Sequence, residues 1–599
     1  MNIAQRIRVE DPRRESPSVD PITLEIIRHQ LVAIPNQIER NIERTAFSPL
    51  IYEYKDYAVG LVDPNGRLVA QSRGSLPIFV ANALGTAVRE GLSLLGPDGI
   101  QTGDVVITNT AAWLGQHLNN VVAYTPIATA HGLMGFFAVL VHWVDVGGAV
   151  PGSCLSSSTS DVWQEGIQLP TLKLIERGAR RTELFRLIAT NTRFPHLLMG
   201  DIEAQLAGCQ TGHDMVQAVI ARYGLDCVRD VIAALWQDSA ASVGKLLNSA
   251  PQGTYRASSF LDDDGVRKDV RVPVEVTAHI RDGELTVDLS GLAPQVAGPF
   301  NAGRNGGAIA AARIACKYLL APMTPVNEGD FTRLRVEVPD GTFLSAGPGA
   351  PIGQSGSTVP TVVDTILRAL SDAFPERAAA AHHGIYGIHA FYGRAPATGE
   401  LFQNLDTVTG GWGATATEDG PGPYRSSGHG DVPDIPSEMQ EVFYPYRIEA
   451  KRLRPDSGGP GKQRGGLGVE KVYRVLHPCQ IVVALDRTAC PPWGLAGGGP
   501  GGTALVEVLR QSGEREALTK GERSLAAGDV VRVLSGGGGG YGPAHERPTD
   551  KVLMDVRLGL VTPQGALRDY GVALDGVGQV NLAETERVRR EMRLKGPGG

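Results

Sequence analysis

The last third of this chain is crowded with glycine and proline, and that crowding sets the strongest limit on what it can fold into. Both residues recur from Tyr444 to about Gly542, and neither suits the interior of a helix. β-branched runs such as Gln480–Leu485 lie between them. Short β-rich runs separated by turn residues are typical of antiparallel sheets. We therefore predict a glycine-rich antiparallel β domain over residues 444–545.

Two glycine runs inside this region, Gly497–Gly502 and Gly536–Gly540, need a separate explanation. A phosphate-binding loop requires a lysine after the glycines and a helix behind them, and both runs lack these features. We interpret the runs as turns between strands, where glycine permits positive φ. The chain is therefore not expected to carry its own nucleotide site of this type.

The length of 599 residues exceeds what one hydrophobic core supports, so several domains are expected. Helical spacing over Pro21–Phe47 and Met199–Leu247, and a strand pair around Asp282-Gly283, precede the glycine-rich part. The predicted class is α+β and multidomain, with a mixed α/β N-terminal half. The predicted parts are a disordered arm 1–20, a mixed α/β domain 21–250, a mixed middle domain 251–443, the β domain 444–545, and a helical tail 546–599.

Composition argues against several classes of partner. The net charge of −7 is mild, and no Lys/Arg stripe with interleaved aromatic residues occurs, so no nucleic acid is expected. The longest apolar stretch, residues 135–141 with its flanks, is shorter than the ~20 residues that cross a bilayer. The segment Met1–Glu15 is polar and rich in arginine. We expect no membrane partner and a cytoplasmic protein.

The six cysteines are scattered and form no Cys-x-x-Cys pair, which predicts neither a disulfide framework nor a zinc ribbon. A reducing compartment fits this pattern. Cys154 follows the loop after His142, yet no basic neighbour in sequence would lower its pKa. We interpret Cys154 as a small packing residue.

Two histidines form the most informative pattern in the chain. His117 and His142 each lie three residues before an oxygen-bearing side chain, Asn120 and Asp145 respectively. Imidazole nitrogen with amide or carboxylate oxygen, without a thiolate, suits Mn, Fe or Zn. Either histidine alone is better explained as hydrogen-bonded to a backbone carbonyl. Together, at the junction of a strand and a loop, they predict a metal site of His117, Asn120, His142 and Asp145.

Segments from about Asp20 to the end of the chain resemble the hydantoinase B/oxoprolinase family. This family includes N-methylhydantoinase B subunits and the large subunits of acetone and acetophenone carboxylases. Many such segments occur in one order, which makes chance resemblance implausible. They include Gly66–Gln71, Gly115–Leu118, Asp145–Gly148, Leu261–Gly265, Leu453–Gly459 and Pro491–Gly499.

The resemblance implies a hetero-oligomer in which a hydantoinase A-like subunit uses ATP with Mg. The missing phosphate loop agrees with this division. The related carboxylases have His-x-x-Asp followed by a second histidine, which matches His117, Asn120 and His142, with asparagine in place of aspartate. A neutral amide binds a cation more weakly than a carboxylate does, so Asp145 would supply the missing negative charge.

The expected activity is ATP-dependent hydrolysis of a cyclic amide of the hydantoin, lactam or oxoproline type. A divalent metal would polarise the carbonyl or lower the pKa of a bound water. One carboxylate, Asp145 or Glu165, would move the proton, although Glu165 could equally cap a turn. The alternatives are a subunit of an ATP- and bicarbonate-dependent ketone carboxylase and a non-catalytic scaffold.

Two further polar groups are interpreted as structural. Glu53 and Asp56 flank Lys55, and a salt-bridged face is favoured there over an acid–base role. His382, His383 and His389 could form a second site. Adjacent histidines on a strand face opposite ways, so a structural role is favoured for this group.

Overall fold

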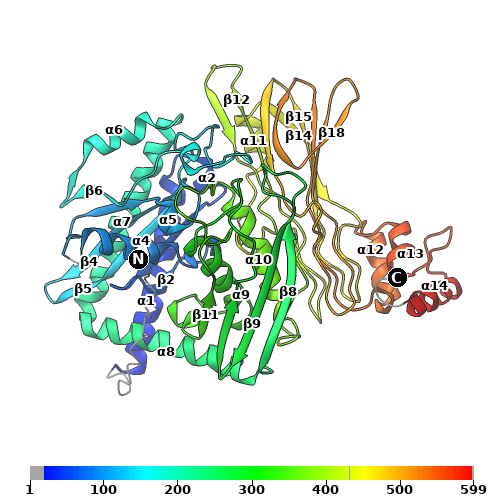
Figure 1. Ribbon diagram of the computed structural model, residues 1–599, viewed down its shortest axis with the longest axis horizontal. Coiled ribbons are helices and arrows are strands. Elements are labelled where there is room, and N and C mark those ends of the chain that lie inside the picture. The colour runs from blue at the N-terminus through cyan, green and yellow to red at the C-terminus, as the bar shows by residue number, and fades with distance from the viewer. Residues whose placement is uncertain (1–18, 97, 431, 596–599) are drawn as a thin grey trace.

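The computed structural model describes residues 19–595 except 97 and 431, and places four sheets side by side with helices packed between and around them (Figure 1). The α+β multidomain class is confirmed. Residues 1–18 of the predicted disordered arm lie outside the described residues. Asp20 is the N-cap of α1 (Pro21–Thr45), because its Oδ1 accepts hydrogen bonds from the backbone N–H groups of Ile22 and Thr23.

The N-terminal region is built on a seven-stranded sheet in the order β2-β1-β5-β4-β3-β6-β7. Helix α1 packs on β1 and β2, and helices α7 and α4 both pack on β4 and β5. Burial of both faces explains why strand β5 is apolar without the alternation of apolar and polar residues. The elements are α2 (Pro49–Tyr52), β1 (Tyr57–Val62), β2 (Leu68–Gln71), α3 (Pro77–Val80), α4 (Ala83–Leu95), β3 (Val105–Thr108), α5 (Ala111–Leu114), β4 (Asn120–Thr129), β5 (Gly132–His142), β6 (Leu172–Glu176) and β7 (Ala179–Arg180).

The register of this sheet brings three chain segments to one end of it. Strands β4 and β5 pair antiparallel with Asn120 opposite His142. Strand β1 pairs with β5 so that Tyr57 faces Val141. The backbone N–H of His142 then donates to the carbonyl of Asp56 at 3.0 Å. Residues far apart in the sequence therefore meet where β5 ends.

One helical stretch of the described residues, Pro77–Leu95, is long and apolar enough by length and composition to cross a bilayer. Of its most apolar window, 71% is buried inside the protein. Core helices have the same composition, so this stretch is weak evidence for a membrane span.

The middle region follows a long helical hairpin and ends in two packed helices. The hairpin consists of α7 (Pro195–Tyr223) and α8 (Leu225–Ser249), preceded by α6 (Thr182–Thr190). A four-stranded sheet has the order β11-β10-β9-β8, and its predicted turn at Asp282-Gly283 is confirmed. Its strands and helices are β8 (Gly253–Leu261), β9 (Val272–Arg281), β10 (Glu284–Asp288), α9 (Ala310–Leu320), β11 (Leu334–Glu337) and α10 (Ser355–Ala369).

Two antiparallel sheets form the glycine-rich part, as the sequence predicts. The C-terminal helices lie at the far side of it from the seven-stranded sheet (Figure 1). One sheet contains β12 (Ile388–Arg394), β13 (Leu401–Asn404), β16 (Cys479–Ala484) and β19 (Lys520–Leu525), and the other β14 (Tyr446–Leu453), β15 (Val469–Val475), β17 (Leu505–Leu509), β18 (Arg515–Leu518) and β20 (Val530–Leu534). The helices are α11 (Ser437–Phe443), α12 (Thr549–Arg557), α13 (Pro563–Tyr570) and α14 (Leu582–Lys595).

The glycine run 536–540 does not form the positive-φ turn that we predicted. None of its five residues has positive φ. Instead, a Cβ placed on any of Gly537–Gly540 would lie 1.8–2.3 Å from backbone atoms of neighbouring segments. Gly459 N–H donates to Gly538 O, and Gly538 N–H donates to Gly466 O. We call this backbone-to-backbone packing of residues 457–466 and 536–540 the glycine layer; close approach, not turn geometry, requires its glycines.

Candidate metal centre

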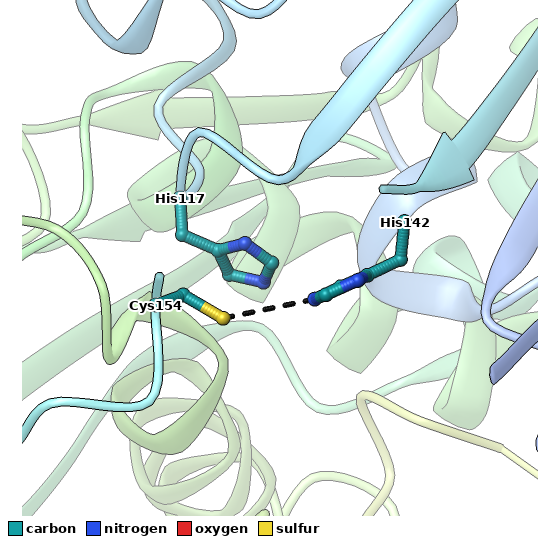
Figure 2. A group of neighbouring side chains, drawn as sticks. All are labelled: His117, His142 and Cys154. Carbon is teal, nitrogen blue, oxygen red and sulfur yellow. Dashed lines mark hydrogen bonds between the residues drawn. The ribbon is translucent and has the colours of Figure 1, made fainter. Parts of the chain in front are cut away.

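The side chains of His117, His142 and Cys154 converge in one buried cavity (Figure 2). Their ligand atoms all lie within 4.8 Å of one another. His142 Nε2 lies 3.6 Å from Cys154 Sγ, and the two imidazole centroids are 5.1 Å apart. Among the residues that the structure describes, no other group of three His, Cys, Asp or Glu side chains converges in this way.

The sheet and one pinned loop explain this convergence. The pairing of Asn120 with His142 sets the start of β4 beside the end of β5, and Asn120 N–H donates to His117 O across a tight turn. In the loop after β5, Ser153 Oγ accepts from the N–H groups of Val146 and Gly148. The residue after Ser153 is Cys154, so this pinned loop presents the thiol to the histidines.

Cys154 is the residue that the sequence analysis interpreted differently. It was assigned to packing, and the expected donor set contained no thiolate. The structure places its sulfur next to the ring of His142, which lies twelve positions earlier in the chain. The proximity of the two residues in sequence was the available signal, but only the folded loop turns the thiol toward the imidazoles.

Asp145 is not brought to the histidines, although it was predicted to be a ligand and an acid–base group. Its carboxylate is fully buried and accepts from the backbone N–H of Arg193 at 2.7 Å and from the Arg193 guanidinium at 2.8 Å. Ser153 Oγ donates to it at 3.0 Å. These contacts occupy its lone pairs, so Asp145 holds the loop that carries Cys154.

Glu165, the other predicted acid–base residue, also lies outside the wall of the cavity. It accepts from the backbone N–H groups of Ile352 at 3.1 Å and Gly353 at 2.7 Å, and from the hydroxyl of Thr159. Burial nevertheless raises its pKa to about 7. The carboxylate positions the segment that leads into α10.

Asn120, in contrast, lies where it was expected. Its Nδ2 is 3.3 Å from both Gln116 Oε1 and His117 Nε2. Its Oδ1 is buried and has no partner among the described residues. Its role as a ligand stays a prediction, but its place beside His117 is consistent with one.

Asp56 is a cavity residue that the sequence analysis set aside. The predicted salt-bridged face is wrong for this residue, because Lys55 pairs with Glu43 at 3.0 Å and Asp56 is buried. Its Oδ1 has no partner in the described chain. Burial raises its pKa to about 7, against the opposing effects of Tyr386 and Arg425. A carboxylate with a free lone pair therefore faces the same cavity as the histidines.

The rest of the cavity wall combines apolar and polar residues. Leu76, Ile78, Phe79 and Leu405 are apolar, and the segment 353–357 at the N-terminus of α10 supplies polar groups. The enclosed space measures about 20 Å³, room for about one water molecule or ion. Tyr386 and His429 complete the wall.

Burial controls the charge of the converging groups. It holds the pKa of His117 well below the ordinary value, with repulsion from His142 adding to the shift, and lowers that of His142 to about 4. Both imidazoles are therefore neutral at pH 7, the form that binds a metal. Burial also raises the pKa of the Cys154 thiol well above its usual value, and a bound cation would reverse that shift.

The three side chains fit a thiolate-binding metal. With Zn–N bonds of about 2.0–2.1 Å and a Zn–S bond of about 2.3 Å, adjacent tetrahedral ligands lie roughly 3.6 Å apart. The His142–Cys154 separation of 3.6 Å matches that spacing. The Nδ1 atoms of both histidines are buried and without a described partner. If a metal binds here, a sulfur donor would favour Zn or Fe over Mn.

The second group of histidines has a structural explanation. His382 stacks on Trp412 with centroids 4.3 Å apart, and its Nδ1 accepts from Gly413 N–H. His383 Nε2 lies 3.1 Å from the carbonyl of Tyr424, and His389 Nε2 lies 3.1 Å from the hydroxyl of Tyr473. His382 and His383 precede β12, so they are not on a strand as assumed.

The geometry describes a multidomain α+β protein with a buried His/His/Cys cavity, and comparison with known proteins places it in a family. The sequence matches the family Hydantoinase B/oxoprolinase over residues 20–544. The chain belongs to this family.

One relative and two solved structures each match 96% of this chain. The caprolactamase subunit beta of Pseudomonas jessenii is 30% identical over 586 residues, which is 96% of this chain and 99% of the relative. The crystal structure of the ATP-dependent caprolactamase from P. jessenii matches with a TM-score of 0.88 at 28% identity, covering 96% of this chain and 100% of that one. A nucleotide-free acetone carboxylase matches with a TM-score of 0.88 at 19% identity, covering 96% and 83%, which shows a shared fold.

Proposed function

We propose that this chain is the metal-bearing subunit of a hetero-oligomeric, ATP-dependent enzyme that hydrolyses a cyclic amide of the hydantoin, lactam or oxoproline type. The observation that carries the proposal is the convergence of His117, His142 and Cys154 within 4.8 Å in a buried cavity. Family membership and the resemblance to an ATP-dependent caprolactamase support the reaction class.

A bound Zn or Fe ion would supply Lewis-acid polarisation of the substrate carbonyl. Asp56 would accept the proton of the attacking water, because its Oδ1 is free and faces the cavity. The N-terminus of α10 would favour negative charge developing on the carbonyl oxygen. The apolar wall formed by Leu76, Ile78 and Phe79 would keep other water away.

A separate hydantoinase A-like subunit would supply ATP with Mg. The relative from P. jessenii is itself named as a beta subunit. In this chain Gly498, Gly501 and Gly537–Gly540 of the two runs pack closely against neighbouring backbone, unlike the glycines of an open phosphate-binding loop. A cytoplasmic location would give both subunits access to ATP.

The test is co-purification with an ATP-using partner, metal analysis, and a screen of ATP-dependent ring opening over hydantoins and lactams by mass spectrometry. Asp56→Asn should reduce turnover by about 10²–10⁴-fold, the usual contribution of a general base. The matched control Glu53→Gln, three residues away and outside the cavity wall, should stay within about twofold, as surface changes do. Equal effects of the two substitutions would reject the role of Asp56.

A ketone carboxylase subunit is the second candidate, favoured by the fold shared with acetone carboxylase and by the match of His117, Asn120 and His142 to the carboxylase pattern. Labelled bicarbonate separates the two reactions. Label retained in the product would support carboxylation, and a ring-opened product without label would support hydrolysis. Purified protein without metal and without either activity would support the scaffold alternative.

A further inference from the structure

A second, larger cavity adjoins the metal cavity. It measures about 230 Å³ and is lined by the turn between α1 and α2, the start of α7, β13 and α11. Leu405 contributes to the walls of both cavities. The small cavity has room for about one water-sized group, so a substrate ring needs space elsewhere, and this neighbour is the adjoining space.

The walls of the larger cavity are mostly apolar, with amide groups at one side. Leu50, Val144, Leu197 and Phe402 form part of the apolar surface. A cavity of roughly 150 Å³ is enough to hold benzene. The larger cavity is therefore of a size and polarity to hold a six- or seven-membered ring.

Asn404 gives this cavity an unsatisfied hydrogen-bond acceptor. Gln440 Nε2 donates to the carbonyl of Ile435 at 2.9 Å, which leaves Gln440 Oε1 as the acceptor for the Tyr446 hydroxyl. The Tyr446 oxygen in turn accepts from Asn404 Nδ2. This chain of bonds fixes the direction of the Asn404 amide, so Oδ1 remains the free end.

Asn404 is fully buried, and its Oδ1 has no partner in the described part of the chain. The Oε1 of Gln403, the preceding residue in the cavity wall, also has none. Leaving a buried acceptor unpaired is costly. Asn404 Oδ1 therefore requires an N–H donor, and a cyclic amide carries one N–H on an otherwise largely apolar ring.

We propose that the cavity lined by Leu197, Phe402 and Asn404 holds the ring of a cyclic amide bearing a free N–H, with Leu405 between it and the metal cavity. The proposal rests on the proposed function for its substrate class. It adds the place where the ring binds and a requirement for an unsubstituted amide nitrogen.

The requirement for an N–H is tested by titration calorimetry on the full chain with δ-valerolactam and with N-methyl-δ-valerolactam. The unsubstituted lactam should bind about tenfold more tightly, the effect of one hydrogen bond to a buried acceptor. Equal affinities, or no binding of δ-valerolactam, would overturn the proposal.

The place of binding is tested by filling the cavity. Leu197→Trp adds bulk at the wall and should weaken lactam binding at least about tenfold. The control Leu187→Trp changes an exposed leucine on α6, 46% accessible, and should leave binding unchanged. Thermal melting and metal content of both variants establish that the fold and the metal centre are intact. Unchanged lactam affinity in Leu197→Trp would place the ring elsewhere.

Two further outcomes separate this inference from the proposed function. The double variant His117→Ala with His142→Ala should lose the metal but keep lactam binding. If the double variant instead loses lactam binding, and Leu197→Trp keeps it, the ring binds in the small cavity. That result would overturn this inference but not the proposed function. Loss of the ATP-using partner in Leu197→Trp, with lactam affinity unchanged, would identify the cavity as a subunit contact and also overturn it. Lactam binding as predicted, without ATP-dependent ring opening, would instead reject the proposed function.

Discussion

Two groups of buried histidines differ in one respect that matters for function. His117 and His142 each leave one ring nitrogen unpaired, and so do His382 and His383. Only the first pair converges, and it converges together with a thiol. Incomplete hydrogen bonding by itself therefore does not support a metal site, and the proposal of a metal site depends on the meeting of several donor atoms at one point.

Replacing both converging histidines is expected to have the largest effect. His117→Ala with His142→Ala should abolish bound metal and lower turnover by about 10³-fold or more, several kcal/mol of transition-state stabilisation. His382→Gln, in the stacked group, should keep the metal. Elemental analysis and turnover measure both results, and a His382→Gln variant that loses metal would break the comparison.

The thiol distinguishes the two groups, so its removal sharpens the comparison. Cys154→Ser should weaken metal affinity at least about tenfold, because an alcohol is a poor ligand for Zn or Fe. The cobalt-substituted protein should also lose its sulfur-to-metal charge-transfer band. Cys209→Ser is the control, because Cys209 is also buried but its thiol donates to the backbone carbonyl of Ala123. A band that survives in Cys154→Ser would contradict the assignment.

We expect Asp145 to stabilise the loop that carries Cys154 and not to bind the metal. Asp145→Asn weakens the bonds to Arg193 and should reduce the free energy of unfolding by about 1–3 kcal/mol, a range discounted because the arginine is partly exposed. Metal content should not change. Asp214→Asn, at a surface pair with His213, should alter neither quantity, and denaturation with elemental analysis checks both.

Glu165 should produce the smallest effect, visible in the pH dependence of stability. Its pKa is raised from 4.5 to about 7 in the folded protein, so the folded form binds a proton that the unfolded form releases within that window. The free energy of unfolding therefore falls as pH rises from about 4.5 to about 7. Glu165→Gln should flatten this part of the melting-temperature profile, and an unchanged profile would argue against the shift.

The sequence was sufficient to predict the fold class and the meeting of two histidines. Periodicity and glycine content predicted the long helices and the antiparallel sheets. His117 and His142 stood out because each lies beside an end of an apolar strand, and the β4–β5 register joins those ends. A short sequence pattern was enough to predict the position of a residue where the pairing of neighbouring strands decides that position.

Contacts between distant segments decided the rest of the site. Asp145 is engaged by Arg193, 48 residues later, and Glu165 by Ile352, 187 residues later. No spacing near either carboxylate reveals those partners. Asp56 gained its place from the pairing of β1 with β5, and Cys154 from a loop conformation. A short motif does not reveal which residue from a distant part of the chain will contact it.

The glycine layer is an unusual kind of interior, because backbone packs directly on backbone at Gly537–Gly540. Its segments are joined by backbone hydrogen bonds, so moving residues 536–540 would break bonds to both Gly459 and Gly466. Hydrogen exchange at Gly538 and Gly540 should consequently be slow although no regular secondary structure is assigned there. The hydrogen-bonded glycine layer would thereby hold the C-terminal helices in a fixed position relative to the two sheets.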